Sequence, residues 1–280
     1  VGVGLSSVVA PIYTAEIAPA RVRGRLVGLV QFNIVFGILL AYASNAVIRE
    51  IVHEDIAWRW MLGVMAVPAV FFLIFLATVP ETPRWLLAHG HEERAAKISE
   101  RLTTTQEESN EQIAEMKAQI AEDASGGKVA FFTRRYRKVI LMAFCIAMFN
   151  QLSGINAILY YAPKVMKLAG GEQVLGPAFP YVASVIVGLM NLIATMAALT
   201  VIDKIGRRQL MIVGSIGYLI SLGFLSAIMF AYKGGAFEEK SAVPVWLILL
   251  GLLAFIASHA FGQGSVIWVF ISEIFPNRVR

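Results

Sequence analysis

Cysteine is nearly absent from this sequence, and so are the groups of side chains that enzymes use for chemistry. Cys145 is the only cysteine among 280 residues, which excludes an intrachain disulfide and most metal sites that depend on thiolates. No stretch places a nucleophile beside a general base or gathers metal ligands. We therefore expect that the chain is not an enzyme and that it uses no metal or cofactor.

Charged residues are also few. They make up 15% of the chain, against about 25% in typical soluble domains, whereas 58% of the residues are hydrophobic and the mean hydropathy is +0.68. Seven stretches contain no Asp, Glu, Lys or Arg apart from Glu16, and each approaches or exceeds the roughly 20 residues that a transmembrane helix needs. These stretches are residues 1–17, 26–48, 60–79, 139–162, 179–202, 210–232 and 243–271. The sequence therefore predicts an all-α membrane protein that crosses the lipid bilayer several times.

The positive charges indicate how these helices are oriented. Of the 24 Lys and Arg residues, 18 lie in the junctions after the first, third, fifth and seventh stretches. Because cytoplasmic loops carry an excess of Lys and Arg, these junctions are predicted to face the cytoplasm. The net charge of +5 follows from this topology. We expect no nucleic-acid partner, since no basic run is interleaved with base-stacking aromatic residues.

Residues 80–138 form the only long polar stretch. Within it, Ile113, Met116 and Ile120 recur at helical spacing, so we expect short amphipathic cytoplasmic helices. Their charged faces are interpreted either as solvated surface or as part of a specific latch. The predicted organisation is the last three transmembrane helices of an N-terminal half in residues 1–79, a cytoplasmic linker in 80–138, and the first four helices of a C-terminal half in 139–280.

Two nearly identical motifs, "AEIAPARVRG" and "SEIFPNRVR", stand near the start and at the end of the chain. Glu16 corresponds to Glu273 and Arg23 to Arg280, with the same spacing. Both copies end a predicted span on the cytoplasmic side, and six spans separate equivalent positions, so the two halves run parallel. Transporters of the major facilitator superfamily have this plan. Because no initiator Met or signal peptide precedes the first span, we interpret the chain as an internal fragment covering about helices 4–10 of 12.

Five motifs carry a resemblance to a known family. In chain order they are "PIYTAEIAPARVRG", "PETPRWLL", "NQLSGINAILYYAP", "DKIGRR" and "GSVIWVFISEIFPNRVR". Together they resemble the sugar porter family of the major facilitator superfamily, and in particular its bacterial sugar–proton symporters. The last motif departs from the family's pattern, because "GQGSVIW" replaces a proline-rich segment near Gly262 and Gly264. The resemblance implies a multi-pass protein of the cell membrane, and we expect the bacterial inner membrane.

Polar residues interrupt the apolar stretch 139–162. Asn150, Gln151 and Asn156 lie near its middle, where polar side chains are costly unless they have partners or line a wet cavity. Amides offer both a donor and an acceptor, which suits the hydroxyls of a neutral polyol. Gly154 favours a local helix break, which would let Gln151 and Asn156 converge on one ligand. The alternative is that these amides hydrogen-bond to neighbouring helices.

The resemblance adds further positions to this site. Gln31, Asn191 and Trp268 match sugar-contacting positions of the family, so the predicted substrate-binding residues are Gln31, Asn150, Gln151, Asn156, Asn191 and Trp268. Many relatives have glutamine at the position of Asn150, so this shorter amide is expected to affect sugar preference. Tyr160 and Tyr161 resemble the family's extracellular gate. They are interpreted equally as part of an interfacial aromatic belt.

Charged residues near the predicted cytoplasmic ends of the spans form a second group. Its members are Glu16, Arg23, Glu81, Arg84, Asp203, Arg207, Arg208, Glu273 and Arg280. Positive-inside topology explains the arginines but not the glutamates. The resemblance implies an ion-pair network that ties the two halves together while the cavity opens outward. Our hypothesis is that Glu16 faces Arg280 and that Glu273 faces Arg23.

These observations favour transport of a neutral monosaccharide, a hexose or a pentose, by alternating access. The expected partners are the sugar, the lipid bilayer and protons as the coupling ion of a symporter. Two alternatives stay open, namely a facilitated-diffusion uniporter and a transporter-like sugar sensor that binds its ligand without moving it. His259, on one face of the last stretch, is interpreted as a hydrogen-bonded structural residue or as a proton-shuttling group.

Overall fold

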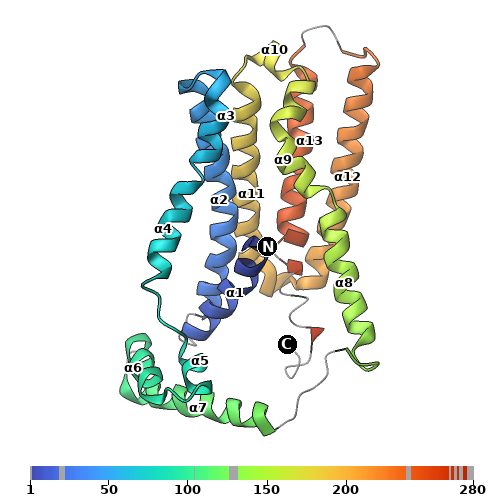
Figure 1. Ribbon diagram of the computed structural model, residues 1–280. Coiled ribbons are helices and arrows are strands. Elements are labelled where there is room, and N and C mark those ends of the chain that lie inside the picture. Colours follow the sequence, from blue (N-terminus) through green and yellow to red (C-terminus); the bar gives the residue numbers. More distant parts are fainter. Residues whose placement is uncertain are drawn as a thin grey trace. The chain divides into compact units, whose positions relative to one another are not determined.

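Helices are the only regular secondary structure in the part of the chain that the computed structural model describes (Figure 1). The described residues are 2–18, 23–103, 105–125, 132–237, 241–264, 266–267, 270 and 274–275. The prediction of an all-α protein is confirmed.

The helices of the described residues range in length from 5 to 29 residues. In chain order they are α1 (Gly2–Ile17), α2 (Arg23–Ile51), α3 (Glu54–Gly63), α4 (Ala66–Leu76), α5 (Pro83–Ala88), α6 (Glu92–Leu102), α7 (Gln106–Ser125), α8 (Arg137–Leu152), α9 (Ile155–Leu168), α10 (Gly171–Leu175), α11 (Phe179–Ile205), α12 (Arg207–Lys233) and α13 (Val243–His259), followed by a π-helical turn (Ala260–Gly264). The helices α5, α6 and α7 lie in the stretch 80–138, where short helices are predicted.

Among the described residues, six helical segments are long and apolar enough to cross a membrane. They are Leu29–Ile51, Glu54–Leu76, Arg137–Leu168, Phe179–Ile202, Arg207–Lys233 and Val243–Gly264. All six coincide with predicted spans. The remaining prediction, residues 1–17, corresponds to α1, whose 16 residues rise about 24 Å, less than the roughly 30 Å of a bilayer's hydrocarbon core.

Two of the six spans consist of two helices each, and local chemistry explains both interruptions. Gly154 separates α8 from α9 in the left-handed conformation with φ 85°, which glycine adopts without a steric penalty, so the break predicted here is confirmed. The interruption between α3 and α4 was not predicted. Pro68 has no N–H for the carbonyl of Val64 four residues earlier, and this carbonyl accepts from the N–H of Val67 at 3.1 Å.

The helices form two compact units, which we describe separately. The first comprises Val1–Gln31, Pro68–Thr133 and Asn277–Arg280. In it, Thr82 caps the N-terminus of α5 by accepting a hydrogen bond from the N–H of Trp85 at 3.2 Å, and Pro83 occupies the first helical position. An ion pair of 2.6 Å between Lys117 and Glu92 joins α7 to α6.

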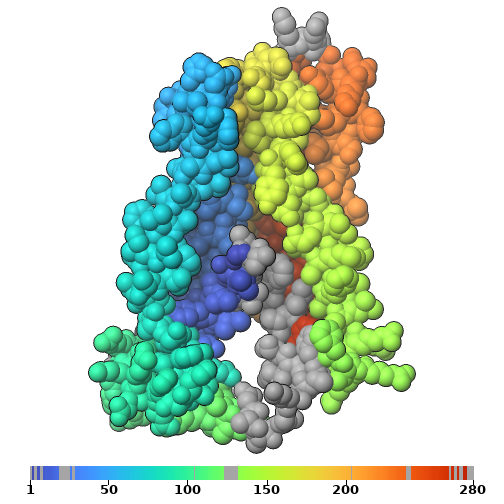
Figure 2. All heavy atoms as spheres, viewed as in Figure 1, coloured from blue at the N-terminus to red at the C-terminus, as the bar shows by residue number. Residues whose placement is uncertain are grey.

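The second unit comprises Phe32–Val67 and Arg134–Pro276. Its core lies between α9, α11, α12 and α13, where α11 and α12 flank α13 (Figure 1). The cluster is formed mainly by Ile155, Leu159, Met166, Val187, Tyr218, Ile248, Leu252, Phe255 and Ile256. In contrast, α8 exposes Leu141, Phe144 and Phe149, and the yellow-green helix itself is visible on the face shown in Figure 2. Exposed large apolar side chains along a membrane-spanning helix are consistent with contact between that helix and lipid.

Glycines bring α12 and the π-helical turn into backbone contact. A Cβ atom on Gly214 would lie 2.6 Å from Cα of Gly262, and one on Gly262 would lie 2.5 Å from Cα of Gly214. Small residues allow membrane helices to pack this closely. At this close contact the chain forms a π-helical turn, Ala260–Gly264, in place of regular α-helix.

Candidate functional site

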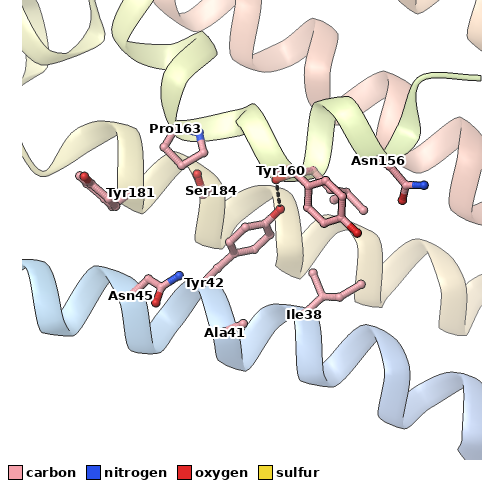
Figure 3. A pocket seen from close by; sticks show the side chains of 10 residues that line it. Ile38, Ala41, Tyr42, Asn45, Asn156, Tyr160, Pro163, Tyr181 and Ser184 are labelled. Atoms are coloured by element: carbon pink, nitrogen blue, oxygen red, sulfur yellow. Dashed lines mark hydrogen bonds between the residues drawn. The ribbon is translucent and has the colours of Figure 1, made fainter. Parts of the chain in front are cut away.

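A pocket of about 380 Å³ lies in the second unit between α2, α9 and α11 (Figure 3). Its lining residues are Ile38, Ala41, Tyr42, Asn45, Asn156, Leu159, Tyr160, Pro163, Tyr181 and Ser184. We call it the α2–α9–α11 pocket. Six of these side chains carry a hydroxyl or an amide and none is charged, so the lining offers hydrogen bonds to a neutral ligand.

The helix break at Gly154 brings two predicted site residues together. Nδ2 of Asn156 donates a hydrogen bond to Oε1 of Gln151 at 2.8 Å. In an unbroken helix these two residues would lie about 140° apart, so the left-handed glycine creates the contact. Both side chains are exposed and Asn156 borders the α2–α9–α11 pocket. Both amides therefore keep hydrogen-bond donors and acceptors that a ligand can reach.

Asn150 and Asn191 are buried instead, with 4% and 6% of their surfaces exposed. The side-chain oxygen of Asn150 has no hydrogen-bond partner among the described residues. A buried acceptor without a donor is unusual in folded proteins, and it marks a place where a hydroxyl group would be stabilised. Asn191 lies on α11, the helix that also contributes Tyr181 and Ser184 to the pocket.

The two tyrosines of the predicted gate differ in position. Both are exposed, Tyr160 at 77% and Tyr161 at 57%, but only Tyr160 lines the α2–α9–α11 pocket. Of the other predicted sugar-contacting residues, Gln31 is half-buried on α2, and Trp268 lies outside the described residues. The gate and the substrate assignments both stay predictions.

Four polar lining residues were not predicted, namely Tyr42, Asn45, Tyr181 and Ser184. Tyr42 and Asn45 are three residues apart on α2, and Tyr181 and Ser184 are three residues apart on α11. The two members of each pair therefore face the same side of their helix. Polar residues at helical spacing within the apolar stretches 26–48 and 179–202 are the signal that could have found them.

Among the charged residues, Glu16 is held by the linker. Oγ1 of Thr82 donates to Oε2 of Glu16 at 2.6 Å. Together with Arg84 and four residues of α7, Glu16 lines a pocket of about 250 Å³ in the first unit. The α7 residues are Gln112, Glu115, Met116 and Gln119. Two members of the predicted network therefore share one cavity with an amphipathic helix.

The other members of the predicted ion-pair network are exposed, half-buried or outside the described part of the chain. Glu81 and Arg208 are exposed, and Arg207 is half-buried at the start of α12. The side chains of Arg23 and Asp203 lie outside the described part of the chain, as do Glu273 and Arg280. The pairs proposed between Glu16 and Arg280 and between Glu273 and Arg23 stay predictions.

Comparisons with known proteins agree with this architecture. The chain is 36% identical to the D-xylose-proton symporter of Escherichia coli strain K12, with all of this chain and 54% of the relative covered. It is 33% identical to the galactose-proton symporter of the same strain, covering 99% and 57%, and 35% identical to the glucose transporter GlcP of Staphylococcus epidermidis, covering 99% and 58%. The chain thus spans about half the length of these relatives.

Solved structures give the same result. The structure is similar to the partially occluded inward-open conformation of the xylose transporter XylE from E. coli, with a TM-score of 0.81, 34% identity, and 99% of this chain and 56% of that chain covered. The inward-open conformation of XylE gives a TM-score of 0.76 at 35% identity, covering 99% and 55%. The family described as "Sugar (and other) transporter" matches residues 1–280. This chain therefore belongs to the sugar porter family of the major facilitator superfamily, a family of multi-pass membrane proteins.

Proposed function

We propose that the protein to which this chain belongs carries a neutral monosaccharide across the membrane by alternating access, in symport with protons. The observation that carries the proposal is the Gln151–Asn156 amide pair at the Gly154 helix break. Transporters of several folds bind their substrates at interrupted helices near the middle of the membrane. Relatives named for xylose, galactose and arabinose are proton symporters, which supports both the class of substrate and the coupling.

The chemistry of the site favours a neutral substrate. After bonding to one another, Asn156 keeps one N–H and both carbonyl lone pairs, and Gln151 keeps two N–H groups and one lone pair. The unpartnered oxygen of Asn150 adds a buried acceptor. A charged substrate would need an opposing charge at this depth, and none of the ten lining residues supplies one. The proposed substrates are hexoses and pentoses. Of the residues proposed to bind them, Asn156 borders the pocket, and the others are Gln31, Asn150, Gln151, Asn191 and Trp268.

The cytoplasmic charges serve the conformational change in this proposal. Exposed ion pairs each contribute roughly 0.2–1 kcal/mol, so several of them bias two states without locking either one. The hydrogen bond between Thr82 and Glu16 supports a role for the linker 80–138 in holding one such acidic residue in place. The halves that the network joins are residues 1–79 and 139–280.

Counterflow in proteoliposomes tests the proposal. Proteoliposomes that contain the intact protein are loaded with unlabelled xylose, glucose or galactose. Uptake of the same sugar in labelled form is then followed with and without a pH gradient. We expect exchange of at least one sugar and concentrative uptake when the outside is acidic. Exchange without any effect of the gradient would indicate a uniporter, and saturable binding without exchange would indicate a sensor. An Asn156→Ala variant is expected to lose exchange, whereas Gly223→Ala, in open space on α12, is the matched control.

A further inference from the structure

Proline creates an unusual need within α9. Pro163 lies inside this helix and has no N–H, so the carbonyl of Leu159 four residues earlier loses the donor that an α-helix would give it. In the hydrocarbon region every backbone polar group must find a partner within the protein or in a water-filled cavity. The structure shows that partner: the hydroxyl of Tyr42 on α2 donates to the carbonyl oxygen of Leu159 at 2.5 Å, the dashed line in Figure 3.

We propose that Tyr42 is a positioning residue that supplies the hydrogen-bond donor missing at Leu159 and thereby holds the half-helix α9 against α2 while the transporter is closed to the outside. The proposal rests on the proposed alternating-access function. Asn156 and Tyr160 lie on the same half-helix within three residues of Leu159, so the bond also fixes the helix that presents the substrate amide and the gate tyrosine to the pocket.

The bond crosses the predicted boundary between the two halves of the transporter. Tyr42 belongs to the N-terminal half, residues 1–79, and Leu159 to the C-terminal half, residues 139–280. Yet α2 from Phe32 onward groups with α9 and α11 in one compact unit. The two halves are therefore joined along the C-terminal part of α2. The distribution of Lys and Arg places this end of the helix outside the cytoplasm.

Two further contacts close the same end. Two cations lie near the ring of Tyr181 on α11, with Arg49 Cζ on α2 at 5.9 Å and Lys167 Nζ on α9 at 5.8 Å from its centre. Both distances fall within the range of cation–π attraction. Lys167 also pairs with Glu172 at 3.1 Å, and Arg49 pairs with Glu54. These contacts connect the same three helices that form the α2–α9–α11 pocket.

The Tyr42–Leu159 hydrogen bond stabilises the outward-closed state more than the outward-open state. When α2 and α9 are together, Leu159 is only 8% exposed and its carbonyl accepts from the Tyr42 hydroxyl, so losing that hydroxyl leaves a largely buried acceptor unsatisfied. When they separate, water entering from outside satisfies that carbonyl. Removing the hydroxyl therefore destabilises the outward-closed state and not the outward-open one, which shifts the population toward the open state.

Thiol labelling of the intact protein tests this proposal without any sugar. Cys145 and every other cysteine of the intact protein are replaced by Ser, and Ser184→Cys serves as the reporter, because Ser184 lines the pocket and is only 2% exposed. A membrane-impermeant maleimide is added outside whole cells. We expect Tyr42→Phe to raise the labelling rate about tenfold, which corresponds to about 1.4 kcal/mol and lies within the usual penalty for an unsatisfied buried group. Tyr232→Phe, a hydroxyl deletion on α12, is expected to leave the rate unchanged.

A second background separates this role from simple loss of packing. Pro163→Ala restores an N–H that bonds the carbonyl of Leu159 within α9. In that background Tyr42→Phe is expected to change the labelling rate by less than about twofold, because no acceptor is left unsatisfied. An equal increase in both backgrounds, or no increase in either, would overturn the proposal. If labelling follows the expectation while no sugar is exchanged, then the proposed substrate is wrong and the role of Tyr42 stands.

Discussion

Gly188 on α11 lies so close to Tyr42 on α2 that no side chain fits between them. A Cβ atom at position 188 would come within 2.8 Å of Cδ2 of Tyr42 and 3.3 Å of Cα of Leu39. The first distance is shorter than any ordinary contact, and the second involves backbone that cannot rotate away. The approach of α2 to α11, and with it the Tyr42–Leu159 hydrogen bond, therefore depends on glycine at this position.

Gly188→Ala is expected to force α2 and α11 apart. Overpacking of this kind typically costs about 1–3 kcal/mol, and the cost falls on the outward-closed state. Thermal unfolding in detergent should show a lower midpoint, and maleimide labelling of Ser184→Cys from outside should be faster. Gly223→Ala is the control, since a Cβ there meets nothing within 4 Å and alanine favours the helix. Equal behaviour of the two variants would contradict the close-contact interpretation.

The positions of the helices could largely be predicted from the sequence, because a bilayer imposes a simple rule on length and composition. The break at Gly154 was also predictable, since a glycine among polar residues in the middle of an apolar stretch weakens the helix there. The sequence did not predict which helices pack together in each of the two compact units. Whether Tyr42 on α2 meets Leu159 on α9 depends on tertiary packing between residues 117 positions apart.

The candidate site divides in a similar manner. Gln151 and Asn156 could be identified because polar groups in an apolar span are expensive without a function. Asn45 and Ser184 were missed because a single amide or hydroxyl in a long span also hydrogen-bonds to its own helix, as Ser184 does to the carbonyl of Pro180 at 2.9 Å. The sequence does not distinguish these two uses of a polar side chain.

Gly154→Ala tests whether the amide pair depends on the backbone. The φ of 85° at this residue costs about 1–2 kcal/mol for a residue with a Cβ, although a methyl group there meets nothing within 4 Å. We expect either a strained break with lower thermal stability or a straighter helix that separates Gln151 from Asn156. In both cases the apparent sugar affinity in counterflow should fall. Unchanged affinity and stability would show that the left-handed conformation is not needed.

Tyr218 and His259 form a buried pair between α12 and α13. Each is 8% exposed, the tyrosine hydroxyl bonds to Nδ1 of the histidine, and the rings stack with centres 5.7 Å apart. Tyr218→Phe should lower stability by about 1–3 kcal/mol because it leaves the imidazole without this partner. Adding His259→Phe should recover much of that loss, since both polar groups are then gone.

The same double variant separates a structural histidine from a proton-shuttling one. If the double variant is stable and still concentrates sugar in a pH gradient, His259 is structural. Loss of the gradient's effect with sugar exchange retained would instead assign the coupling to His259. Thermal unfolding and counterflow on the same preparations provide both measurements, and Tyr232→Phe controls for loss of a tyrosine hydroxyl elsewhere on α12.

Asn150 offers a test in which stability and function should change in opposite directions. Its side-chain oxygen is buried without a partner among the described residues, and such an orphan acceptor costs about 1–3 kcal/mol. Asn150→Leu has nearly the same shape and removes the acceptor, so the unfolding midpoint without sugar should rise. If the oxygen awaits a sugar hydroxyl, the same variant should weaken sugar binding, and sugar should stabilise it less than it stabilises the wild type. A lower midpoint for Asn150→Leu would mean that the amide has a partner of its own in the folded protein and that its burial is structural.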